Sequence, residues 1–207
     1  MYRMVLKRCF DWLGATVLIG LLCLPMLIVA GLVLLLLGRP IFFRQERPGR
    51  DGRPFVLWKF RTMTTLPAQD GNSAPAQDGD RLTRCGRFLR ATSLDELPEL
   101  FNVLRGDMSL VGPRPLLMEY LELYTPQQAR RHEIRPGITG WAQVHGRNAT
   151  TWKRRLELDV WYVDHLSFWR DLQILARTVL QVITCHGVRA EGHATMPKLG
   201  KSLTETQ

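Results

Sequence analysis

A long run of uncharged residues near the start of the chain constrains its fold more than any other feature. Residues 12–37 occupy 26 positions without Asp, Glu, Lys or Arg, and most of them are Leu, Val or Ile. A straight helix of this length would be about 39 Å long, more than the roughly 30 Å hydrocarbon core of a bilayer. No small-residue cleavage site follows, as a signal peptide would require. The run therefore predicts a helix held in a membrane.

Pro25, at the midpoint of this run, bears on how the helix enters the membrane. Proline removes a backbone donor and crowds the preceding turn, so the sequence predicts a bend or break there. Each arm would then be about 20 Å long, too short to span. Basic residues flank both ends, which favours two cytoplasmic ends and a re-entrant helix-break-helix. A straight spanning helix that tolerates its proline remains the alternative. The flanking basic residues are Arg3, Lys7 and Arg8 before the run, and Arg39, Arg44, Arg47, Arg50 and Arg53 after it.

Length and charge limit the remaining possibilities. The 207 residues predict a membrane hairpin over 1–38, a cytosolic membrane-associated catalytic domain over 39–190 and a tail over 191–207. The formal net charge of +9 suits anionic lipids or phosphorylated substrates. It would also suit nucleic acid, but no zinc spacing, recognition helix or RNA-binding motif is present, so we expect no nucleic acid partner. The four cysteines lack paired spacing and predict reduced thiols facing the cytosol.

The pattern after the membrane run predicts an α+β fold that is mainly helical. Two short β-rich runs, 40–47 and 54–61, flank a Gly/Asp turn and predict a β-hairpin at the membrane surface. Helical spacing predicts amphipathic interfacial helices over 116–131, from 150 onward and over 171–183. Residues 66–80 repeat a short polar stretch and predict a loop.

Two adjacent acids, Asp95 and Glu96, form the principal candidate site. Ser93 and Glu96 have the spacing of a capping box, and Gly106 can end the helix that follows. Asp95 would then lie at the positive end of a helix, where a carboxylate stays ionised and can act as a nucleophile. In the alternative reading Glu96 only caps Ser93 and Asp95 is only a favourable first-turn acid. Pro98 leaves the start of this helix uncertain by a few residues.

Arginine-bearing loops supply candidate phosphate ligands. Arg114 stands between two prolines, so a stiff backbone presents a guanidinium that can hold phosphate through two hydrogen bonds. Residues 135–141 and 146–148 are glycine-punctuated loops that also carry arginine, and Lys59 and Arg61 share one face of the predicted hairpin. Ordinary turns and a solvated strand face explain the same patterns without any ligand.

Five segments in order connect these pieces to a known family. They are 59–63 (KFRTM), 92–98 (TSLDELP), 107–115 (DMSLVGPRP), 136–144 (PGITGWAQV) and 158–162 (LDVWY). Along nearly its whole length the chain resembles the bacterial sugar transferase family, the small monotopic phosphoglycosyl transferases. The resemblance implies a re-entrant anchor broken at Leu24-Pro25. It implies an enzyme that moves a sugar 1-phosphate from a UDP-sugar to a polyprenol phosphate such as undecaprenyl phosphate, the first membrane step of glycoconjugate assembly.

The resemblance also implies roles for individual residues. Asp95 would attack the β-phosphate, release UMP and carry a covalent phosphosugar, while Glu96 would help to hold Mg²⁺. Arg90 and Arg114 would neutralise phosphate charge, and Asp159 matches a further acidic position of the family's active site. Weaker candidates for substrate binding are Lys59, Arg61, Arg147 and Asn148.

The implied location is the cytoplasmic face of a bacterial inner membrane, among membrane lipids. The sequence leaves the sugar and the oligomeric state open, a homodimer included, although residues 191–197 resemble members that use a diacetamido-trideoxy hexose. Two rival functions also remain open. One is a non-catalytic membrane-surface module that binds polyprenyl phosphate, and the other is a one-step transferase in which Asp95 is a base.

Overall fold

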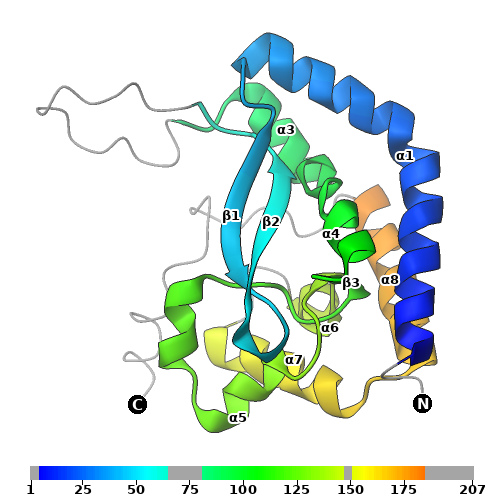
Figure 1. Ribbon diagram of the computed structural model, residues 1–207, viewed down its shortest axis with the longest axis vertical. Helices are drawn as coiled ribbons and strands as arrows, with labels where there is room; N and C mark the ends of the chain where they lie inside the picture. Colours follow the sequence, from blue (N-terminus) through cyan, green and yellow to red (C-terminus); the bar gives the residue numbers. More distant parts are fainter. Residues whose placement is uncertain (1–4, 65–80, 147–150, 185–207) are drawn as a thin grey trace, which may run out of the picture.

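The chain forms a mainly helical α+β structure with two small two-stranded sheets (Figure 1). The computed structural model describes residues 5–64, 81–146 and 151–184. The predicted loop 66–80, Arg147, Asn148, Cys185 and the predicted tail lie outside the described residues. The elements are α1 (Lys7–Leu37), β1 (Phe42–Pro48), η2 (Arg50–Gly52), β2 (Pro54–Phe60), α3 (Arg84–Thr92), η3 (Leu94–Glu96), α4 (Glu99–Arg105), β3 (Ser109–Val111), η4 (Met118–Leu123), α5 (Pro126–Ala129), η5 (Arg130–His132), β4 (Gly137–Thr139), α6 (Trp141–Gly146), α7 (Trp152–Asp164) and α8 (Phe168–Ile183).

The uncharged run forms one long helix, α1, with Pro25 inside it. The ribbon bends between two arms near its middle (Figure 1). The predicted bend is therefore confirmed, but the chain does not break into two helices, because the remaining hydrogen bonds carry the helix past the missing proline donor.

Most apolar side chains of α1 face outward. Within the described residues it is the one helix long and apolar enough to cross a bilayer. An apolar surface this large is not expected on a soluble protein and indicates contact with lipid. The exposed side chains include Trp12, Leu13, Val17, Leu21, Leu24, Leu27, Ile28, Leu32, Leu35 and Leu36.

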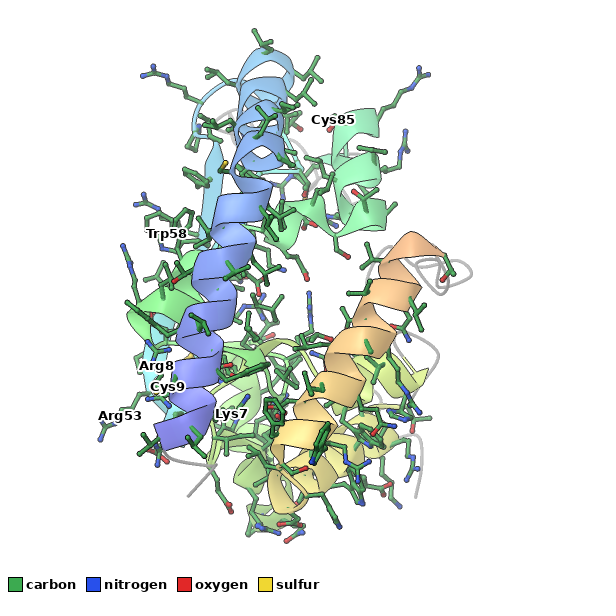
Figure 2. All side chains as sticks on the ribbon, turned by 90° about the vertical axis from the view of Figure 1, so that its right-hand side faces the viewer. Lys7, Arg8, Cys9, Arg53, Trp58 and Cys85 are labelled. Carbon is green, nitrogen blue, oxygen red and sulfur yellow. The ribbon has the colours of Figure 1, made fainter. Side chains whose placement is uncertain are left out.

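The first turns of α1 are tied to the rest of the protein through charged groups. Lys7 is buried and forms an ion pair with Asp171 of α8 at 2.8 Å (Figure 2). Asp11 accepts hydrogen bonds from the Ser109 hydroxyl at 2.8 Å and from the backbone N–H of Leu110 at 3.0 Å. Arg8 donates to two carbonyls at the end of α4. Lys7 and Arg8 thus also hold α1 against α8 and α4.

Strands β1 and β2 form the predicted antiparallel hairpin. Their register pairs Phe43 with Lys59 and Arg47 with Phe55. Directly opposed residues share a face and every second residue repeats it, so Arg47 and Lys59 lie on the same face of the hairpin. Asn102 of α4 fixes the outer edge of β2, donating to the carbonyl of Val56 at 2.7 Å and accepting from the N–H of Trp58 at 3.2 Å.

The second sheet pairs β3 with β4 in parallel and was not predicted. It depends on close backbone contact, because a Cβ at Gly137 would lie 2.0 Å from the backbone nitrogen of Gly112. The helix predicted over 116–131 is wrong. The chain instead forms η4, α5 and η5, because Thr125 caps a new helical start with Pro126 in its first turn.

Helices α7 and α8 confirm the two predicted C-terminal helices. Helix α8 buries Ile174 in the main core but leaves several apolar side chains exposed. Figure 2 shows α1 and α8 on the same side of the molecule. This side therefore presents an extended apolar surface. The exposed apolar residues of α8 are Phe168, Trp169, Val179, Leu180 and Val182.

Candidate active site

A sharp turn between α3 and η3 positions the acid pair. Helix α3 ends at Thr92, and Ser93, its C-cap, has φ 58° and ψ 17° in the left-handed region. A non-glycine residue there is strained, and such strain is often found at functional sites. The predicted capping box is wrong, since the Ser93 side chain caps no helix and α4 begins only at Glu99. The predicted end is confirmed, because Gly106 caps α4 with φ 99°.

Asp95 is a buried carboxylate with 8% of its surface exposed. Among the described residues its side chain has no hydrogen bond or ion pair partner, yet Lys59, Arg114 and Arg90 act on it electrostatically. Burial raises the pKa of Asp95 to about 6, and the neighbouring Glu96 carboxylate adds to the rise, against these three cations. Asp95 is therefore a carboxylate without a fixed partner in a cationic environment, as a nucleophile for phosphate requires.

Glu96 is held between two cations. Its Oε1 lies 2.6 Å from Lys59 Nζ and also accepts from Arg114 Nη2, while its Oε2 accepts from Arg114 Nη1 at 3.3 Å. Burial would raise the pKa of Glu96, but Arg114 and Lys59 outweigh burial and hold it well below its usual range. Glu96 thus stays ionised and orients Arg114 and Lys59.

Glu99 is a third acid of this site and was not among the predicted residues. It is 2% exposed, and its Oε1 lies 3.1 Å from Lys59 Nζ. Burial raises the pKa of Glu99 to about 7 although Lys59 opposes the rise. For Lys59, burial would lower the pKa, but Glu96 and Glu99 together raise it. An acid three residues after Glu96 was the available sequence signal, since residues three apart share a helix face.

A buried ion pair between Arg131 and Asp159 fixes the backbone of Arg114. Arg131 donates to the backbone carbonyl of Arg114 at 2.7 Å and pairs with Asp159 at 2.8 Å. The side chains of Arg131 and Asp159 are 1% and 2% exposed. In this arrangement Asp159 supports Arg114 through Arg131. Its substrate contact remains a prediction.

Arg90 acts electrostatically on Asp95. Its Nε donates to the Thr62 hydroxyl at 3.1 Å. Gly86, in the same helix, packs directly on Thr62, since a Cβ there would lie 1.9 Å from the Thr62 carbonyl oxygen. Arg61 points elsewhere and donates to the carbonyls of Gly38 at 2.6 Å and Arg39 at 3.1 Å, where α1 ends. The weaker expectation that Arg61 binds substrate is therefore not supported.

The structure brings five predicted residues together: Lys59, Arg90, Asp95, Glu96 and Arg114. Asp159 lies behind them, and Arg147 lies outside the described residues. Over residues 5–64, 81–146 and 151–184, no group of three or more His, Cys, Asp or Glu forms a ready metal site. Mg²⁺ needs only one or two carboxylates when phosphates supply the other ligands. Asp95 fits this requirement. Glu96 would first have to release Lys59 or Arg114 before it could bind the metal.

Sequence comparison relates the chain to known proteins. Residues 2–185 match the family described as bacterial sugar transferase. The uncharacterized sugar transferase EpsL of Bacillus subtilis is 54% identical over 192 residues, covering 93% of this chain and 94% of the relative. A UDP-glucose:undecaprenyl-phosphate glucose-1-phosphate transferase of Caulobacter vibrioides is 46% identical, covering 86% and 70%. A UDP-N-acetylgalactosamine-undecaprenyl-phosphate N-acetylgalactosaminephosphotransferase of Aeromonas hydrophila is 41% identical, covering 89% and 45%.

Proposed function

Because the chain belongs to the bacterial sugar transferase family, we propose that it transfers a sugar 1-phosphate from a UDP-sugar to undecaprenyl phosphate. The observation that carries the proposal is Asp95, a buried carboxylate without a fixed partner that faces Lys59, Arg90 and Arg114. Those cations suit the diphosphate of a nucleotide sugar. The outward apolar surface of α1 supports a reaction at a membrane.

In the first step, a carboxylate oxygen of Asp95 attacks the β-phosphorus of the donor. A new Asp95 Oδ–phosphorus bond forms, and the bond from that phosphorus to the bridging oxygen breaks. UMP leaves with the electron pair, and the sugar phosphate stays on Asp95. Arg114, oriented by Glu96, and Arg90 stabilise the charge on the phosphate oxygens during this step.

In the second step, a phosphate oxygen of undecaprenyl phosphate attacks the same phosphorus. The bond to Asp95 breaks, its carboxylate is restored, and an undecaprenyl diphosphate sugar leaves. Two steps allow one small site to accept a soluble donor and a lipid acceptor in turn. Relatives act on glucose and N-acetylgalactosamine donors by name, so we assign the donor class as UDP-hexoses.

Magnesium is the proposed cofactor, and its removal provides a first test. Bound Mg²⁺ would neutralise phosphate charge, with Asp95 as its available protein ligand. We expect purified protein with Mg²⁺ to release UMP from at least one UDP-hexose in a panel. EDTA should abolish release, and added Mg²⁺ should restore it. Unchanged release in EDTA would exclude the metal, and no release from any donor would contradict the proposed function.

The pH dependence tests the role of Asp95. Its pKa is raised to about 6, and only the ionised form can attack. The kcat/KM for the donor should therefore rise about tenfold per pH unit below pH 6 and level off above it. Measuring UMP release from pH 5 to 8 would show this rise in kcat/KM and the plateau above it. The pKa of Glu99 is also raised, to about 7, so Glu99→Gln is the control. This variant should show the same rise in kcat/KM below pH 6. A flat profile below pH 7 would assign the limiting chemistry to another group.

We also propose a re-entrant helix with both ends on the cytoplasmic face. The bend at Pro25 and the basic residues at both ends of α1 support this topology. In a chain whose four natural cysteines are replaced by serine, Arg3→Cys and Arg39→Cys should both be labelled by an impermeant thiol reagent from the same side of the membrane. Labelling from opposite sides would identify a spanning helix.

A further inference from the structure

Two arginines outside the predicted site, on different elements, lie within electrostatic range of Arg114. Arg155 belongs to α7 and Arg47 to β1. Neither contributes to the Lys59–Glu96–Arg114 ion pairs. Together with Arg114 they place three guanidinium groups in one region.

Arg155 reaches this region from α7. It lies four residues before Asp159, and residues four apart share a helix face. Asp159 pairs with Arg131, which in turn donates to the carbonyl of Arg114, so this face of α7 is directed at Arg114. The Arg155 side chain is buried, and its guanidinium lies 5.5 Å from the centre of the Trp152 ring. Burial and the positive charge of Arg114 lower the pKa of Arg155 to about 10.

Arg47 reaches the same region from the hairpin. The β1–β2 register places it on the face that carries Lys59, and β1 contacts η4 close after Arg114. Its Nε is buried and has no hydrogen-bond partner among the residues that the structure describes, whereas its Nη2 donates to Gln45 at 2.6 Å. Burial and the positive charge of Arg114 lower the pKa of Arg47.

Within the described part of the chain, cations outnumber acids around Arg114. Among the described residues of this region there are six cations, Lys59, Arg90, Arg114, Arg47, Arg131 and Arg155, and four nearby acids, Asp95, Glu96, Glu99 and Asp159. Three guanidinium groups within electrostatic range repel one another, and burial increases this cost. A doubly charged anion would reduce the repulsion between the guanidinium groups. It could also accept a hydrogen bond from the buried Nε of Arg47.

We propose that Arg47, Arg114 and Arg155 form a second phosphate-binding subsite, next to the phosphate that Asp95 attacks. Its ligand is a phosphate monoester dianion. That chemistry is shared by the departing UMP and by the phosphate of the lipid acceptor. The inference rests on the proposed function for the identity of its ligand, but binding at the subsite needs no transfer reaction.

Equilibrium binding to the full chain in detergent micelles tests the subsite. The probes are UMP and geranyl phosphate, with uridine and geraniol as their phosphate-free counterparts. Arg47→Gln and Arg155→Gln should each weaken one of the two phosphate probes about tenfold or more, because each removes a charged hydrogen-bond donor. Arg44→Gln, on the opposite face of the same strand, and Arg154→Gln, exposed and paired with Glu157, are matched controls and should change affinity less than twofold.

The probe that loses affinity identifies the phosphate. Weaker UMP binding assigns the subsite to the nucleotide, and weaker geranyl phosphate binding assigns it to the acceptor. Unchanged affinity for both, no phosphate binding to the unmodified protein, or an equal loss of uridine or geraniol binding would overturn the proposal. Arg155→Lys, which keeps the charge, should recover part of the affinity if the subsite recognises phosphate. Asp95→Asn keeps all three arginines and should bind the phosphate probes at least as tightly as the parent protein, so a failure of transfer chemistry is distinguishable from a failure of this subsite.

Discussion

Replacing Asp95 with asparagine should lower the rate of UMP release by at least about 10³-fold, because the amide cannot form the bond to phosphorus. The side chain has nearly the same size, and Asp95 makes no hydrogen bond within the described residues. The variant should therefore fold and associate with membranes like the parent protein. UMP release from a UDP-sugar, measured alongside flotation with vesicles, separates these two properties.

Asp51→Asn is the matched control for this variant. Asp51 lies in the exposed turn of the hairpin at φ 56°, a conformation that asparagine adopts readily. Its activity should equal that of the parent. Incubating the parent protein with donor alone should leave a phosphosugar on Asp95. Persistent absence of that adduct would favour the one-step transferase, in which Asp95 is only a base. Unchanged UMP release by Asp95→Asn would remove Asp95 from the chemistry altogether.

Replacing Asp159 with leucine should destabilise the protein by about 3–5 kcal/mol, because it leaves the Arg131 guanidinium buried without its counter-ion. The free energy of unfolding in detergent measures this effect. Activity should fall in the same variant, since Arg131 also holds the carbonyl of Arg114. Wild-type stability with reduced activity would instead favour direct contact between Asp159 and the substrate.

The double variant Arg131→Met/Asp159→Leu separates folding from function at this position. Replacing a whole buried ion pair with apolar side chains of similar size is often neutral or stabilising. We therefore expect most of the lost stability to return. Activity should stay low, because no donor then reaches the Arg114 carbonyl. Recovery of both properties would mean that Arg114 does not depend on Arg131.

Asp95, Glu96 and Arg114 could be predicted because they occur in short motifs whose chemistry is local, whereas Arg90 was predicted only through the family resemblance. A bend at Pro25, the β1–β2 hairpin and the Gly106 helix end follow from backbone preferences of single residues. The capping box at Ser93 could not be excluded in the same way, because its spacing is correct. It fails because Lys59 and Arg114, distant in sequence, bind the Glu96 carboxylate more strongly than a backbone N–H would.

The sequence by itself determined that this chain has a long apolar helix, a β-hairpin and an acid pair among basic residues, since charge, periodicity and backbone restrictions are properties of neighbouring residues. Only the tertiary structure decided that Glu99 joins the acid pair, that Asp159 pairs with Arg131 and that Arg47 and Arg155 lie within electrostatic range of Arg114. These arrangements join residues that are far apart along the chain. Their electrostatic energies depend on burial and distance, which folding alone sets.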